Sequence, residues 1–353
     1  MKAVFLVNIG ECFMQFEPIY LYLKSRGDEV LLVAYDLQGD KWKHSTPISS
    51  LFKERHYPFI YGNEFNRRSS YPFDFSFIAA QYTECVPGLS VGRLASQSKI
   101  VWIGYGYTVL PFTISPKHTS AISLVFAENE IAKSYLQTKF SKDAQIVVTG
   151  YSKFANYSLP PLDLQGESDS TWSKEKPLKL LYTPRWYKEH GTCSYDGICR
   201  ALIQMAKEYP AIHLIFRFHP LVRYDISEAL EAVKSLSNVS IHKESNYFSL
   251  LEEIDVLISD PSTLVGEFFY LNKPLILTKH NSCPFTPFGE ILKSGCYLGD
   301  DSKAVQTVLH NLLEGKDFLA SQRKTICKTY YSCYPDPVQS IVKTLDSMTL
   351  KGK

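Results

Sequence analysis

Short apolar runs alternate with helix-like segments from the first residues of the chain. An apolar run at 4–7 precedes a loop with Gly10, a helical spacing of apolar residues over 16–24, and a second run at 30–34. This order is typical of a β-α-β unit, which begins a parallel sheet. Further strands are expected at 58–61, 100–103, 124–127 and 145–149, with a helix at 128–140. The first half is therefore predicted to be an α/β domain.

The same alternation returns after a polar stretch at 158–177, which is rich in Pro, Ser and acidic residues and is predicted to be a linker. Strands are expected at 178–183, 213–218, 239–242, 256–259 and 275–278, and helices at 195–208, 227–235, 262–271 and 304–313. We predict an α/β fold of two doubly wound, Rossmann-like domains that face a cleft, as in the GT-B architecture. The predicted parts are 1–157, the linker 158–177, a second domain at 178–335 and a C-terminal helix or tail at 336–353.

Composition narrows the function classes. A chain of 353 residues exceeds the size of one core, and 45% apolar with 21% charged residues is ordinary for a globular protein. A net charge of +2 argues against nucleic acid as a partner. The eight cysteines form no C-x-x-C pair, and the first apolar run is too short for a signal peptide or membrane span. We expect a cytoplasmic protein with no metal site and no cofactor.

One strand ends in two side chains that suit an anion. In the run 214–220 an apolar strand leads into Arg217 and His219, and Pro220 prevents its continuation. Arg217 and His219 alternate with Phe218, so both can project to one face at the carboxyl end of the strand, where open α/β sheets bind ligands. A guanidinium and an imidazole suit a diphosphate. The alternative is that His219 ties down the loop while Arg217 pairs with a carboxylate.

A second strand-loop-helix unit follows at 256–267. Asp260 is predicted to cap the helix and Pro261 to occupy its first position. Ser262 and Thr263 then fall in the first turn, where backbone N–H groups can bind phosphate, and Glu267 lies on a face that can reach a ribose diol. Plain helix capping is the alternative for this unit.

Four blocks in the second half resemble, in order, the CDP-glycerol glycerophosphotransferase family of teichoic-acid and capsule synthesis. The blocks cover about residues 145–280, and together they are more specific than any one alone. They are Val-Val-Thr-Gly-Tyr at 147–151, Leu-Leu-Tyr-Thr-Pro-Arg-Trp at 180–186, Arg-Phe-His-Pro at 217–220, and 259–274 with its Asp-Pro-Ser-Thr start.

The resemblance implies a nucleotide-donor side in the C-terminal domain. On this basis His219 and Arg217 contact the pyrophosphate, Ser262 and Thr263 hold phosphate with Asp260 at the helix start, and Glu267 bonds the ribose. Thr183 and Arg185 line the opposing loop. His219 is also expected to be catalytic. The loop at 185–195 is either a platform for an acceptor sugar or cytosine, or a plain polar connection.

The first half, expected to be the acceptor side, departs from that family. Where the family has a Trp-His-Gly-Thr run with a catalytic histidine, this chain has Trp102, Ile103 and Gly104. A hydroxyl acceptor still needs a base within hydrogen-bond reach. Glu11, in the loop after the first strand, is the first candidate; His118 and Glu128 follow, although each of the three can instead be structural.

Three functions are therefore weighed. The first is transfer of glycerol- or ribitol-phosphate from a CDP-linked donor to a hydroxyl of a glycan or lipid-linked acceptor. The second is a GT-B glycosyltransferase that uses a nucleotide sugar, which the missing histidine favours. The third is a non-catalytic binder of nucleotides or glycans. A lipid-linked acceptor would bring the protein to the inner face of the cell membrane as a peripheral contact, although the sequence contains no clear basic amphipathic helix.

Overall fold

A computed structural model describes residues 1–37, 47–78, 86–104, 108–112, 114, 116–158, 176–188, 191–219, 222–244, 246–331 and 336–350, with the backbone alone at 11, 12, 116, 117 and 350. Residues 159–175 of the predicted linker lie outside these ranges. The chain divides into an N-terminal unit of 1–107, 112–158 and 333–353 and a C-terminal unit of 108–111 and 159–332.

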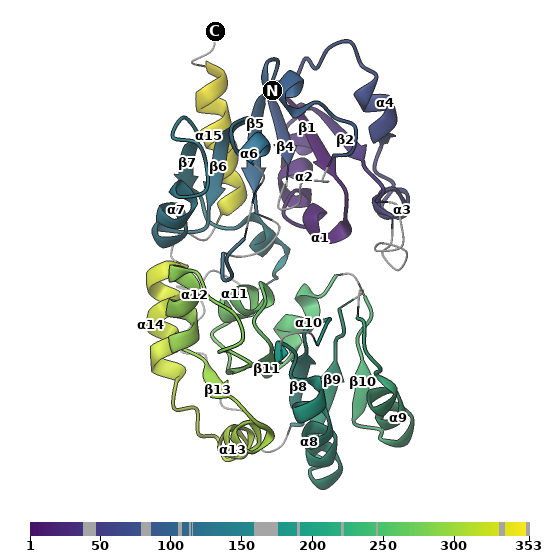
Figure 1. Ribbon diagram of the computed structural model, residues 1–353, viewed down its shortest axis with the longest axis vertical. Coiled ribbons are helices and arrows are strands. Elements are labelled where there is room, and N and C mark those ends of the chain that lie inside the picture. The colour runs from purple at the N-terminus through teal and green to yellow at the C-terminus, as the bar shows by residue number, and fades with distance from the viewer. Residues whose placement is uncertain are drawn as a thin grey trace. The chain divides into compact units, whose positions relative to one another are not determined.

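The N-terminal unit is built on a seven-stranded parallel sheet in the order β3-β2-β1-β4-β5-β6-β7 (Figure 1). Its strands are β1 (Lys2–Val7), β2 (Glu29–Ala34), β3 (Phe59–Tyr61), β4 (Phe75–Ile78), β5 (Lys99–Ile103), β6 (Ile122–Ala127) and β7 (Gln145–Val148). Its helices are α1 (Gly10–Phe13), α2 (Glu17–Ser25), α3 (Ile48–Glu54), α4 (Gly62–Asn66), α5 (Val91–Ala95), α6 (Pro116–Thr119), α7 (Glu130–Gln137), the 3-10 turn η2 (Ser152–Asn156) and α15 (Pro337–Leu350).

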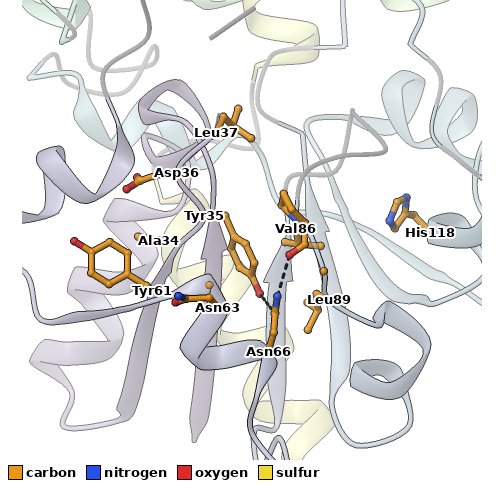
Figure 2. Close-up of a pocket in the computed structure, with 13 residues that line it drawn as sticks. Ala34, Tyr35, Asp36, Leu37, Tyr61, Asn63, Asn66, Val86, Leu89 and His118 are labelled. Carbon is orange, nitrogen blue, oxygen red and sulfur yellow. Dashed lines mark hydrogen bonds between the residues drawn. The ribbon is translucent and has the colours of Figure 1, made fainter. Parts of the chain in front are cut away.

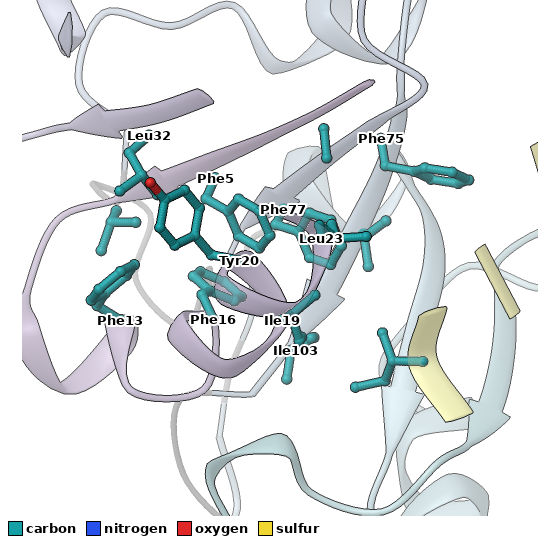
Figure 3. Packing of buried hydrophobic residues seen from close by; sticks show 14 of the residues in the cluster. Phe5, Phe13, Phe16, Ile19, Tyr20, Leu23, Leu32, Phe75, Phe77 and Ile103 are labelled. Atoms are coloured by element: carbon teal, nitrogen blue, oxygen red, sulfur yellow. The ribbon is translucent and has the colours of Figure 1, made fainter. Parts of the chain in front are cut away.

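Aromatic side chains fill one face of this sheet (Figure 3). Phe5 of β1 stacks on Phe77 of β4 with ring centroids 4.4 Å apart, and Phe16 and Tyr20 cover Phe5 from the α2 side. Full burial of one such ring contributes about 1.5–3 kcal/mol, so this cluster is a major source of stability for the N-terminal unit. α15 packs on the same cluster through Ile341 and its apolar neighbours on one helix face. This helix therefore completes the core of the N-terminal unit.

The C-terminal unit is built on a six-stranded parallel sheet in the order β10-β9-β8-β11-β12-β13 (Figure 1). Its strands are β8 (Leu178–Thr183), β9 (Ile212–Phe216), β10 (Val239–Ile241), β11 (Val256–Ser259), β12 (Leu275–Thr278) and β13 (Tyr297–Gly299). Its helices are α8 (Tyr195–Glu208), α9 (Ser227–Ser235), α10 (Phe248–Glu253), α11 (Leu264–Phe269), α12 (Pro287–Ser294), α13 (Ser302–Leu313) and α14 (Ala320–Tyr330).

The prediction of two α/β units with parallel sheets is confirmed. β8, β11 and β12 and the helices α8 and α9 have the predicted bounds. The sequence analysis missed β4, which lies between β1 and β5, and the edge strand β13. β4 contains the polar residue Ser76 and β13 ends in Gly299, so neither forms a continuous apolar run.

The strand order fixes where a ligand can enter the C-terminal sheet. β8 is followed by β9 and β10 on one side, and the chain then returns to place β11 on the other side of β8. Loops from β8 and β11 therefore leave in opposite directions at the carboxyl edge. This topological switch point is where parallel α/β sheets bind ligands.

Candidate functional site

The candidate site begins where β8 and β11 end side by side. Thr183 and Ser259 are paired in the sheet register, so the loops that follow them start at the same edge. Arg217 follows β9 on the other side of β8, and its backbone N–H donates to the carbonyl of Tyr182. The three predicted motif strands thus meet at one edge.

Asp260 holds the loop between β8 and α8 in place. Its side chain is 1% exposed, and Oδ2 accepts hydrogen bonds from the backbone N–H groups of Arg185 at 2.7 Å and Ser194 at 3.0 Å. Oδ1 accepts from the hydroxyl of Thr278 at 2.6 Å. One carboxylate therefore joins both ends of the loop to the end of β12.

This arrangement corrects the predicted helix start. α11 begins at Leu264 with Thr263 as its N-cap, and no side chain caps it. Asp260 does not cap α11 because both of its oxygens turn toward the β8 loop and β12. Pro261 likewise precedes the helix instead of opening it. A role for Asp260 in donor binding stays a prediction, and the structure gives its carboxylate three protein donors.

Two polar atoms at the end of β8 are buried and have no partner within the described part of the chain. Thr183 Oγ1 and Arg185 Nη1 have no hydrogen-bond partner among the described residues. The Arg185 guanidinium lies over the ring of Tyr187, with its Cζ 5.2 Å from the ring centroid. A buried donor without a partner costs about 1–3 kcal/mol, so such atoms mark places where a ligand can supply the missing bond.

Arg217 is held by the neighbouring strand end. Its Nη1 donates to His242 Nδ1 and to the carbonyl of Glu244, each at 2.7 Å, and its Cζ lies 4.9 Å from the ring centroid of Tyr247. Burial first, and then the charge of Arg217, lower the pKa of His242 from its ordinary value. The imidazole is therefore neutral and accepts the hydrogen bond from the guanidinium.

His219 is exposed and contacts different neighbours from Arg217. Its ring centroid lies 5.9 Å from that of Trp186, and its carbonyl accepts from the backbone N–H of Val222. The Arg223 guanidinium lies over the Trp186 ring, with its Cζ 4.8 Å from the ring centroid. Pro220, the end of the predicted motif, lies outside the described residues.

Glu267 lies beneath Tyr247. It is 1% exposed, and its Oε2 accepts from the Tyr247 hydroxyl at 2.5 Å. Because the same Tyr247 ring stacks on Arg217, the two predicted ligand residues are linked through a residue that the sequence analysis did not select. The Tyr247 hydroxyl therefore occupies one oxygen of the carboxylate that was predicted to bind a ribose.

Ser262 and Thr263 follow β11 directly. The Ser262 hydroxyl lies 3.3 Å from the hydroxyl of Ser259, which itself donates to the carbonyl of Asp260 at 2.7 Å. Ser262 and Thr263 also accept the first backbone bonds of α11 through their carbonyls. Both predicted residues are therefore at the carboxyl edge, next to the end of β8.

The base candidates in the N-terminal unit lie on separate elements. Glu11 is in α1, and only its backbone is described. Glu128 follows β6 and is 5% exposed. His118 is in α6, where burial lowers its pKa and its Nδ1 has no hydrogen-bond partner among the described residues. Ile103 ends β5 and packs in the aromatic core.

A pocket of about 800 Å³ lies at the carboxyl ends of β2 and β3 (Figure 2). Its walls include Tyr35, Asp36, Tyr61, Asn66 and His118. The sequence analysis missed it, although Tyr35 and Asp36 directly follow a buried strand, a position where polar residues can signal a site.

The described residues contain neither a cluster of metal ligands nor a helix that could span a membrane. No group of three His, Cys, Asp or Glu side chains within the described ranges is arranged to hold a metal ion. None of the helices in the described part of the chain has the length and apolar character needed to cross a bilayer.

Comparison with known proteins identifies the fold and the family. A Listeria monocytogenes structure assigned to a UDP-N-acetylglucosamine 2-epimerase aligns with a TM-score of 0.68 at 14% identity, over 99% of this chain and 97% of the other. The UDP-GlcNAc 2-epimerase from Neisseria meningitidis, bound to UDP-GlcNAc, aligns with a TM-score of 0.64 at 12% identity, over 99% and 100%. The wall teichoic acid polymerase TagF aligns with a TM-score of 0.61 at 12% identity, over 100% and 90%.

These likenesses agree with the predicted GT-B fold. Among curated proteins, none matches the chain by sequence. The sequence profile of the UDP-N-acetylglucosamine 2-epimerase family matches residues 117–319, which is more than half of the chain. The resemblance to the glycerophosphotransferases is thus supported only at the level of fold, through TagF. The chain belongs to the UDP-N-acetylglucosamine 2-epimerase family.

Proposed function

We propose that this protein is an enzyme that acts on a nucleotide-activated sugar, specifically a UDP-N-acetylhexosamine, whose diphosphate binds at the carboxyl edge of the C-terminal sheet. Family membership supports a UDP-sugar as the substrate, and the Neisseria meningitidis relative is bound to UDP-GlcNAc. The observation that carries the proposal is the pair of buried atoms at the switch point, Thr183 Oγ1 and Arg185 Nη1, which have no hydrogen-bond partner among the residues that the structure describes.

A diphosphate matches the groups at this edge. Its oxygens accept hydrogen bonds, whereas Arg185 and Arg217 donate them from the ends of adjacent strands β8 and β9. Charge-assisted bonds from guanidinium groups to phosphate are among the strongest in proteins. Asp260 contributes indirectly, because it fixes the backbone of Arg185 and so limits where the guanidinium can lie.

The same groups can assist the chemistry of a sugar nucleotide. When the bond between the anomeric carbon and the diphosphate breaks, negative charge develops on the leaving nucleotide, and nearby guanidinium groups stabilise it. Inversion at C2 also needs a base that removes the C2 proton as the bond from C1 to the diphosphate breaks, which leaves a double bond between C1 and C2. An acid then returns a proton to the opposite face of C2 while the diphosphate oxygen bonds to C1 again. His219, Glu11, His118 and Glu128 are the candidates for these proton transfers.

A second candidate is transfer of a polyol phosphate from a CDP-linked donor. The block Arg217–His219, the Asp-Pro-Ser-Thr turn and the likeness to TagF, one structure of which was soaked with CDPG, favour it. The diphosphate would occupy the same edge, but the attack would fall on phosphorus and CMP would leave.

Product analysis separates the two candidates. The purified protein is incubated with UDP-GlcNAc and, separately, with CDP-glycerol, each with and without a glycan acceptor, and products are followed by NMR and nucleotide chromatography. Formation of the C2 epimer, or release of UDP, is expected from UDP-GlcNAc. Release of CMP from CDP-glycerol with no change in UDP-GlcNAc would overturn the main proposal in favour of the second.

A pair of histidine variants tests whether the carboxyl edge of the C-terminal sheet takes part in the reaction. His219→Ala is expected to reduce turnover at least tenfold because it removes the exposed imidazole beside Trp186. His310→Ala is the matched control, since His310 is an exposed histidine on α13 of the same unit. Unchanged turnover in His219→Ala would remove His219 from the reaction.

A further inference from the structure

The pocket of the N-terminal unit differs in the charge of its lining residues from the proposed nucleotide site. Its volume of about 800 Å³ falls within the range of small-ligand pockets. None of the lining residues that the structure describes is a lysine or arginine. A phosphate or nucleotide diphosphate would therefore meet no cationic side chain on these walls, and an uncharged ligand is favoured.

The walls are held in place by a chain of hydrogen bonds. The Tyr35 hydroxyl donates to Asn66 Oδ1 at 2.7 Å, and Asn66 Nδ2 donates to the carbonyl of Pro87 at 2.9 Å (Figure 2). Asp36 accepts from the backbone N–H of Ser49 at 2.9 Å and from its hydroxyl at 2.6 Å. The pocket is therefore formed before a ligand arrives, which reduces the entropy cost of binding.

The groups that face the pocket combine an aromatic surface with hydrogen-bonding atoms. Tyr61 is 42% exposed, so part of its ring is open to a ligand, and Asn63 beside it is also exposed. Asp36 can accept further hydrogen bonds through its remaining lone pairs. At another wall, His118 Nδ1 is buried without a hydrogen-bond partner among the described residues.

We propose that this pocket binds an uncharged sugar, with the C–H face of one pyranose ring on Tyr61 and its hydroxyl groups bonded to Asp36 and Asn63, which lie on the same side of the pocket (Figure 2). Sugars present an apolar C–H face and several hydroxyl groups that both donate and accept. Binding here does not depend on the nucleotide reaction proposed above, so either proposal can fail without the other.

Close packing beneath Tyr61 offers a way to disturb the pocket without removing a polar group. A Cβ atom on Gly62 would lie 2.4–2.9 Å from three ring atoms of Tyr35. A methyl group at this position must therefore displace the Tyr35 ring or the α4 backbone. Gly62→Ala changes the shape of the pocket while the residues proposed to contact the sugar remain.

Ligand-observed NMR tests the proposal. Saturation transfer from the full-length protein is measured for the methyl glycosides of glucose, galactose, mannose and N-acetylglucosamine, and for N,N′-diacetylchitobiose. UDP serves as the anionic probe. At least one neutral sugar is expected to bind, and a stronger signal from the disaccharide would indicate the end of a glycan instead of a free monosaccharide.

Variants then assign the signal to the pocket. Tyr61→Ala and Asn63→Ala, both at exposed positions, are expected to weaken the sugar signal at least fivefold, and Gly62→Ala to weaken it as well, with UDP binding unchanged within twofold. Tyr22→Ala is the matched control because Tyr22 is 37% exposed on α2 of the same unit. No sugar binding by the unaltered protein, or binding that Tyr61→Ala leaves unchanged, would overturn the proposal; loss of UDP binding alone would count only against the proposed function.

Discussion

The carboxyl edges of the two sheets share a geometry but differ in charge. After β8 and β9 the C-terminal sheet presents Arg185 and Arg217, with Arg223 over Trp186 close by. After β2 and β3 the N-terminal sheet presents tyrosine, asparagine and aspartate, and no lysine or arginine among the described lining residues. The same backbone arrangement therefore suits an anion in one unit and a neutral ligand in the other, because the first residues after each strand differ.

The largest effect is expected from Asp260→Asn. An amide nitrogen in place of one carboxylate oxygen faces the N–H groups of Arg185 and Ser194, or the Thr278 hydroxyl, and cannot accept from them. We expect the free energy of unfolding of the C-terminal unit to fall by about 3 kcal/mol. Urea denaturation followed by circular dichroism measures it. Asp196→Asn is the control, since the Asp196 side chain is 73% exposed on α8 of the same unit, and it should change this free energy by less than about 1 kcal/mol.

Removal of a cation from the carboxyl edge of the C-terminal sheet should weaken the binding of a nucleotide diphosphate to this unit. Arg185→Met keeps the apolar stem but removes the guanidinium, so UDP is expected to bind about 10–100-fold more weakly in calorimetric titration. Arg200→Met is the matched control, since the Arg200 side chain is 82% exposed on α8. Equal affinities for the two variants would place the diphosphate elsewhere.

Tyr247→Phe should have a smaller effect because it removes one oxygen and keeps the ring. The carboxylate of Glu267 loses the donor at 2.5 Å, while the ring can still stack on Arg217. We expect a loss of about 1–2 kcal/mol in unfolding free energy. Tyr209→Phe, at a position 36% exposed, should show almost no change. A loss no greater than that of Tyr209→Phe would show that the Glu267 contact is unimportant for stability.

The smallest effect is expected from the contribution of His242 to the pH dependence of folding stability. Its pKa in the folded protein is lowered from the ordinary 6.5 by burial and by Arg217, with Glu244 and Glu253 acting in the opposite direction. Below about pH 6.5 the unfolded chain binds more protons than the folded one, so this contribution is full above that pH and is lost as the pH falls. His242→Gln should make the decline in melting temperature between pH 7 and 5 less steep. Part of the decline should remain, because the pKa values of His118 and His213 are also lowered. An unchanged slope would contradict this assignment.

Strong hydrophobic patterns made most of the fold predictable. β8, β11 and β12 are apolar runs that end at polar residues, and their bounds were predicted correctly. β4 was missed because its four residues include Ser76, which is fully buried and bonded to the Ser98 hydroxyl at 2.7 Å. The pattern within a short run does not show that a serine distant in the sequence will form a hydrogen bond with the buried hydroxyl.

The site was predictable only in its position along the chain. The sequence identified the ends of β8 and β11, because polar residues follow apolar runs there, but it placed the end of β9 at 218, two residues beyond its actual end at Phe216. It could not show that Asp260 would bind Ser194 and Thr278, or that Tyr247 would cover Glu267, because these contacts join elements 18 to 66 positions apart. Tertiary contacts of this kind decide which polar residues remain available to a ligand.

Hydrogen–deuterium exchange of the unaltered protein with saturating UDP tests the central claim most directly. We predict slower exchange in peptides that contain 183–188, 217–219 and 260–263, and no change in peptides that contain 34–37 or 61–66. Protection confined to the peptides of the N-terminal unit, with none after β8, β9 and β11, would contradict the account.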